Sequence, residues 1–166
     1  MLLHLIAFGI ISTAGSVVTP GTGDVTVPAG QIAVGKGNTA VSGLGTGIPA
    51  VAFVWTQPLN PRDRNEYAMD WSSILGTEKI TSIQALTMTA LGVSLGVEID
   101  SDADRVPVLD TNGQKIGLWF KVDDAFKDNA AFAWPGTKIG ISALIRTDST
   151  PYRELERTWV LTVAKQ

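Results

Sequence analysis

Carboxylates at alternate positions form the most conspicuous chemical motif of the chain. Glu98, Asp100, Asp102 and Asp104 are each separated by one residue, a spacing with which calcium loops gather oxygen ligands around one hard cation. The motif does not continue as such a loop does, because Arg105 stands where glycine is needed and no glutamate occupies the twelfth position. A calcium site and a solvated acidic turn both remain open at Asp100–Asp104, and the departures favour the turn.

A second group of acids lies in the segment 123–134. Asp123, Asp124 and Asp128 stand near two aromatic residues, Phe126 and Trp134. Two carboxylates across a cleft are what glycoside hydrolysis requires. A surface loop anchored by aromatic side chains has the same composition, and we favour it because carboxylates are mostly solvent-exposed.

Missing residue types restrict the remaining chemistry. The chain has no cysteine and one histidine, His4, so thiol nucleophiles, thiolate zinc sites and disulfides are excluded, and a Ser-His-Asp triad could use only His4. The run Gly43–Gly47 lacks the Lys-Ser/Thr pair of a phosphate-binding loop. We therefore expect a protein that is not an enzyme and that uses no cofactor.

Charge is distributed very unevenly along the 166 residues. Net charge is −3, so no basic surface is available for nucleic acid or anionic lipid, and we expect neither nucleic-acid nor membrane partners. Of all Asp, Glu, Lys and Arg residues, only Asp24 and Lys36 precede residue 61. A stretch of this length with almost no charge would be poorly soluble if exposed, so we expect something to cover it.

The first part of this stretch, residues 1–16, allows three interpretations. It resembles the apolar core of a secretory signal, yet no Lys or Arg precedes the apolar run. At roughly 11 apolar-dominated residues it is too short to cross a bilayer as a helix. We favour a buried strand or an assembly arm over a signal or anchor.

Residues 23–50 contain a repeat of seven residues. The blocks read GDVTVPA, GQIAVGK, GNTAVSG and LGTGIPA. Glycine in every block disfavours a helix, and the third and fifth positions share one side of a strand. We expect short strands rather than a flexible glycine-rich linker, with an apolar interface at the fifth positions, Val27, Val34, Val41 and Ile48.

Alternating apolar residues dominate the rest of the chain. After a boundary at residues 57–64, strands are expected over 65–71, 93–99, 114–123, 137–146 and 154–164, with weaker ones near 80–89 and 105–109. Turns are expected at 110–113 and 148–151, and a helical turn at 71–75. About seven strands predict an all-β, immunoglobulin-like β-sandwich at residues 62–166, preceded by an uncharged β arm at residues 1–57.

Two separated blocks carry a resemblance to a known family. Residues 66–76, EYAMDWSSILG, followed by Ile80-Thr-Ser82, resemble the opening of an Ig-like domain found in bacteriophage structural proteins of the fibre-to-tail adaptor type. The end is similar too: PGTK at 135–138, an alternating strand, a turn at 148–151 and a final strand to Val163. The resemblance covers about residues 58–164. Gln84-Ala-Leu86, where an aromatic residue is expected, and the long connection 121–135 depart from it.

The resemblance implies a virion protein, an adaptor between tail or neck and fibres. Its expected partners are other virion structural proteins and further copies of the chain, in a ring or trimer. A capsid decoration protein and a secreted Ig-like module that binds glycans remain alternatives. Trp119, Phe126 and Trp134 are the aromatic residues we expect at an interface, while Asp70 is expected to cap the turn at Ser72.

Overall fold

The computed structural model describes residues 21–22, 33–34, 48 and 52–166. These residues form ten strands, two short α-helices and one 3-10 helix, which are β1 (Gly21–Thr22), β2 (Ala33–Val34), β3 (Phe53–Trp55), β4 (Asn65–Asp70), α1 (Ser72–Leu75), β5 (Ile80–Met88), α2 (Ala90–Ser94), β6 (Val97–Asp100), β7 (Val108–Leu109), β8 (Lys115–Val122), η1 (Ala130–Phe132), β9 (Thr137–Thr147) and β10 (Glu154–Val163). The expectation of an all-β protein is confirmed.

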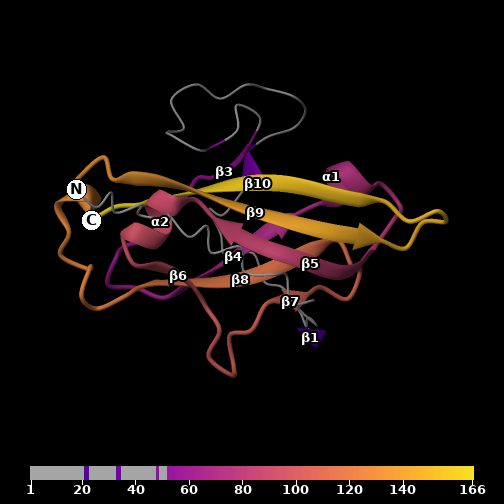
Figure 1. The fold of residues 1–166 in the computed structure, drawn as a ribbon, viewed down its shortest axis with the longest axis horizontal. Coiled ribbons are helices and arrows are strands. Elements are labelled where there is room, and N and C mark those ends of the chain that lie inside the picture. Colours follow the sequence, from indigo (N-terminus) through magenta and orange to yellow (C-terminus); the bar gives the residue numbers. More distant parts are fainter. Residues whose placement is uncertain (1–20, 23–32, 35–47, 49–51) are drawn as a thin grey trace, which may run out of the picture.

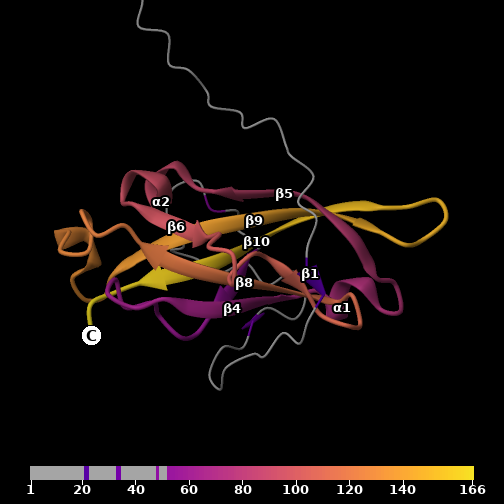
Figure 2. The same ribbon diagram turned by 90° about the horizontal axis from the view of Figure 1, so that it is seen from below.

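The strands form two five-stranded sheets (Figures 1 and 2). The first sheet has the order β1-β7-β8-β4, and β6 pairs with β8 beside β7. The second has the order β2-β3-β10-β9-β5. All pairs are antiparallel except β1 with β7 and β3 with β10. The long strands β8, β9 and β10 run along the long axis of the molecule (Figure 1).

Alternation of apolar and polar residues explains the strands. In β8, Ile116, Leu118, Phe120 and Val122 are buried, while Lys115, Trp119 and Lys121 are only partly buried on the other face. β9 alternates in the same way from Ile141 to Thr147, whereas in β4 three consecutive residues, Tyr67, Ala68 and Met69, are buried. Each sheet therefore presents one apolar face to the other and one mixed face outward.

The strand expected over 93–99 is wrong in its first half. Residues 90–94 form α2, and only Val97–Asp100 form a strand, β6. Leu95 donates its amide to the carbonyl of Leu91 at helical spacing, and Gly96 has a φ of 69°, a conformation that no strand residue adopts. Val93 and Leu95 therefore do not share one face of a strand. Leu95 is buried at the end of the helix, whereas Val93 is 64% exposed.

The predicted turns are confirmed where the sequence places them. Gly113, with a φ of 67°, closes the β7–β8 hairpin and donates to the carbonyl of Asp110. Asp110 in turn accepts from the amides of Gln114 and Lys115. In the helical turn α1, the amide of Ser72 donates to the carboxylate of Asp70 at 2.9 Å, the capping role expected for this residue.

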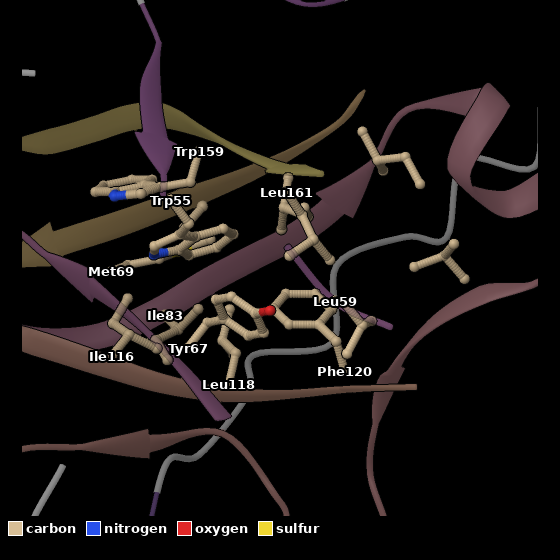
Figure 3. Packing of buried hydrophobic residues seen from close by; sticks show 14 of the residues in the cluster. Trp55, Leu59, Tyr67, Met69, Ile83, Ile116, Leu118, Phe120, Trp159 and Leu161 are labelled. Carbon is tan, nitrogen blue, oxygen red and sulfur yellow. The ribbon is translucent and has the colours of Figure 1, made fainter. Parts of the chain in front are cut away.

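Large aromatic side chains fill the space between the sheets (Figure 3). Trp55 of the second sheet packs against Tyr67 and Phe120 of the first, with ring centroids 5.2 and 5.8 Å apart. Trp159 lies between Phe53 and Trp71, at 4.8 and 5.0 Å. Aromatic contacts of Trp55 with Tyr67 and Phe120 therefore join the two sheets within the core.

Segments from the uncharged part of the chain belong to these sheets. β1 extends the first sheet at β7, and β2 extends the second at β3. β3 lies before the expected domain boundary at residue 57, yet its Trp55 is only 1% exposed and its indole N–H donates to the carbonyl of Ala68 at 2.8 Å. The hydrophobic core therefore includes residues on both sides of that boundary.

Replacing Trp55 tests this joining of the two parts. Trp55→Ala should lower the free energy of unfolding by about 3–5 kcal/mol, because it removes a large core side chain and leaves the Ala68 carbonyl without its donor. Urea denaturation followed by circular dichroism measures the change.

The matched control is Trp134→Ala, since Trp134 is 79% exposed. It should change the free energy of unfolding by less than about 0.5 kcal/mol. Equal losses from the two substitutions would contradict a core centred on Trp55.

Candidate interaction surface

Charged side chains gather on the outer face of the first sheet. Register places Trp119 of β8 between Glu66 of β4 and Asp100 of β6, and it places Lys121 opposite Glu98. We call this surface the charged face and define it by these five residues. It contains Trp119, one of the three aromatic residues that the sequence predicts at an interface.

Asp100 is the centre of an ion-pair network on the charged face. Its side chain is fully buried, and its carboxylate lies 3.2 Å from Lys121 Nζ, 3.4 Å from Arg64 Nη1 and 3.8 Å from Arg105 Nη1. Asp102 also pairs with both arginines, at 3.0 and 3.3 Å. The acids that suggested a calcium loop are therefore neutralised by basic side chains of the chain itself.

Titration of this network follows from its geometry. Burial alone would raise the pKa of Asp100, but the backbone N–H of Asp102 and the positive charges of Lys121 and Arg64 outweigh it and hold this pKa below 3.8. The same contact with Asp100 raises the pKa of Lys121. Both groups are therefore charged at neutral pH. Among the described residues, no group of three or more His, Asp or Glu side chains is arranged to hold a metal ion.

Trp119 is partly buried and is covered by a cation. The guanidinium of Arg105 lies over its ring, 5.6 Å from the centroid. This contact also orients Arg105 toward Asp100 and Asp102. Tryptophan and arginine are both residue types that are enriched at interfaces.

A hollow of about 230 Å³ adjoins the charged face where β8 ends. Its walls carry acids and bases in nearly equal number, and they are Asp63, Arg64, Glu98, Lys121, Val122, Asp123, Asp124 and Lys127. This balance gives the hollow no strong preference for either a polyanion or a cation.

The acids considered for glycoside hydrolysis make local contacts. Asp123 accepts from the amide of Ala125, Asp124 pairs with Lys127, and Asp128 pairs with Arg62. Lys127 and Arg62 lower the pKa of Asp124 and Asp128, respectively. A catalytic acid needs a raised pKa, so these contacts act in the opposite direction.

The two loop aromatics have different surroundings. Phe126 packs against the core beside Gly96, where a Cβ atom would lie 2.7 Å from its Cγ. It therefore anchors the loop to the body of the protein. Trp134 is 79% exposed at the far end of the same connection. Of these two, only Trp134 offers a large apolar surface to another molecule.

Two of the four predicted repeat positions lie within the described residues. Val34 belongs to β2 and is paired with Val54 of β3. Ile48 packs with Val54 against buried Ala52 and Val160 on the outer face of the second sheet. Val27 and Val41 lie outside the described residues.

One exposed apolar region was not predicted from the sequence. No charged residue occurs from Ile80 to Val97, which is the whole of β5 and α2. Leu91 and Val93 of α2 are nevertheless 42% and 64% exposed. The absence of charge over these residues was a sequence signal for an exposed apolar region, but the alternating apolar residues predicted burial instead.

Comparison of the chain with protein-family models, with curated proteins and with solved structures finds no match. Neither α-helix of the described part is long and apolar enough to cross a membrane.

Replacing Asp100 tests the ion-pair network and its pH dependence. Its folded-state pKa is depressed, so its stabilising contribution is complete above the ordinary value of 3.8 and is lost as pH falls through the lower folded value. Asp100→Asn should therefore cost about 1–3 kcal/mol at neutral pH, because Lys121 loses the nearer of its two carboxylate partners. Urea midpoints measured between about pH 7 and pH 2 should show wild type and variant converging in acid.

Asp104→Asn is the control, because the Asp104 side chain is 74% exposed. It should change stability by less than about 0.5 kcal/mol. A constant difference between Asp100→Asn and wild type at every pH would contradict the assignment.

Proposed function

We propose that the chain is a non-enzymatic structural protein of a bacteriophage virion, an adaptor that links tail or neck to fibres through oligomeric β-mediated contacts. The observation that carries the proposal is that strands of the uncharged segment pair with strands of both sheets. Where described, this segment adds β1 to one sheet and β2 to the other. A segment that covers itself by strand addition can do the same with neighbouring chains.

The proposal includes an immunoglobulin-like sandwich for residues 62–166. The strand order supports it, because β4, β8 and β6–β7 follow one another as strands B, E and D do, while β5, β9 and β10 follow as C, F and G do. The parallel pairing of β3 with β10 adds a strand beside the last one. The sequence blocks at 66–76 and 135–163 that resemble the adaptor family fall on β4–α1 and β9–β10.

The chemistry of the surface agrees with adhesion. Most carboxylates of the charged face and the following loop are paired with Arg or Lys. Trp134 remains as an exposed apolar anchor, and exposed tryptophans are frequent hot spots at interfaces. The partners proposed are further copies of the chain and other virion structural proteins.

The oligomeric state of the full-length chain tests the proposal. Multi-angle light scattering over a range of protein concentrations should give a defined multiple of the chain mass, consistent with closed symmetry. Electron micrographs of the same sample should show particles of uniform size. A chain that is monomeric and fully soluble at every concentration would contradict an assembly protein of this kind.

A secreted glycan-binding module is the second candidate, and exposed Trp134 is the observation that favours it. Sugar rings stack on exposed indoles, so this function predicts binding to a glycan array that Trp134→Ala abolishes. The adaptor proposal predicts no specific binding in the same assay. The variant should remain folded, because Trp134 contributes little to the core.

A further inference from the structure

Within the described part of the chain, β5 is an edge strand of the second sheet. Among the described strands, β5 pairs with β9 alone, and Figure 2 shows it with α2 along one side of the molecule. Two irregularities interrupt its first half, between Ile80 and Ser82 and between Ile83 and Ala85. From Ala85 to Met88 the register is continuous. Four residues of regular edge therefore present backbone groups that a further strand could pair with.

Natural proteins protect such edges with charges or proline, and this edge has neither. The run from Ile80 to Val97 is uncharged and contains no proline. The next element, α2, carries the exposed side chains of Leu91 and Val93. Within the described residues, the irregularities are the device against edge pairing that β5 carries, and they leave Ala85–Met88 regular.

The other long edge, β4, is protected. Glu66 and Asp70 place charges along it, and Arg64 directly precedes it. The carbonyl of Ala68 is already occupied by the indole N–H of Trp55. The contrast between the two edges selects β5 as the place where a strand can be added.

The repeat supplies a matching strand. In the second block, GQIAVGK, Ala33–Val34 form β2 and pair antiparallel with β3. The third block, GNTAVSG, carries the same dipeptide at Ala40–Val41, seven residues later, and it has no charged residue. The two blocks share Gly, Ala and Val at the same positions, and Ala-Val is the part of the second block that pairs at a sheet edge, so the third block offers the same dipeptide to another edge.

We propose that the Ala85–Met88 edge of β5 receives the third repeat block, residues 37–43, from a second copy of the chain. This inference rests on the proposed function and names the contact through which copies join. The added strand then covers the uncharged edge of β5. The length suits the site, because a block of seven residues with glycine at its end spans four residues of regular strand.

The residues that flank the third block are numerous enough for it to reach a neighbouring chain. Val41 is seven residues from both Val34 and Ile48, which lie in or on the second sheet of their own chain. Seven extended residues reach roughly 23 Å. The block can therefore extend beyond its own sheet to a neighbour without dissociating β2.

Cysteine pairing between two differently tagged chains tests the contact, since the natural chain has no cysteine. One full-length chain carries Val41→Cys and the other Thr87→Cys, an exposed position of β5. After mixing and mild oxidation, the mixed disulfide dimer should exceed by roughly tenfold that formed by Val41→Cys with Thr111→Cys, a control on the exposed β7–β8 turn, because bound partners have a high effective concentration.

A charge at the same edge gives an independent readout. Thr87→Lys should weaken self-association at least about tenfold, because a lysine on an edge strand disfavours pairing with a further strand. Thr111→Lys should leave association unchanged, and both variants should melt as wild type does.

The outcomes separate this inference from the proposed function. An oligomer that forms equally well with Thr87→Lys, and that gives no excess of the mixed disulfide, overturns the β5 contact but leaves the assembly function standing. A chain carrying both Val41→Cys and Thr87→Cys that closes only within itself also overturns it. A monomeric wild-type chain overturns both.

Discussion

The packing of Trp55 between the sheets is the contact on which the rest of the structure depends. Its ring lies against Tyr67 and Phe120 of the opposite sheet, and its N–H occupies the carbonyl of Ala68. Trp55 also belongs to β3, the strand that links β10 to β2. One side chain therefore packs the two sheets together, occupies one carbonyl of β4, and ties the uncharged segment to the core.

Charge is partitioned by position around this core. The outer face of the first sheet carries the Asp100 network, where Lys121, Arg64 and Arg105 offset the cost of burying a carboxylate. The second sheet has an outer apolar patch that Ile48 helps to cover, and its β5 edge has no charge at all. We propose that the first surface keeps the protein soluble and ordered, while the second joins it to further copies.

Strands were predictable from sequence where alternation and burial agree. β4, β8, β9 and β10, the hairpin at Asp110–Gly113 and the cap by Asp70 follow from local patterns. α2 did not, because the positive φ of Gly96 breaks an alternation that composition alone supports. The Asp100 network was also beyond reach, since Arg64 and Lys121 come to Asp100 only through the pairing of β6 with β8 and the start of β4. Long-range pairing decides which charges meet.

Hydrogen exchange of the β5 amides tests the central claim most directly, namely that open strand edges of this protein are completed by neighbouring copies. Exchange is compared between the assembled protein and the same protein diluted until its copies separate. The account predicts that the outward-facing amides of Ala85–Met88 exchange slowly in the assembly and rapidly after dilution, while the amides of β8 stay protected in both. Equal exchange at Ala85–Met88 in the two states would contradict it.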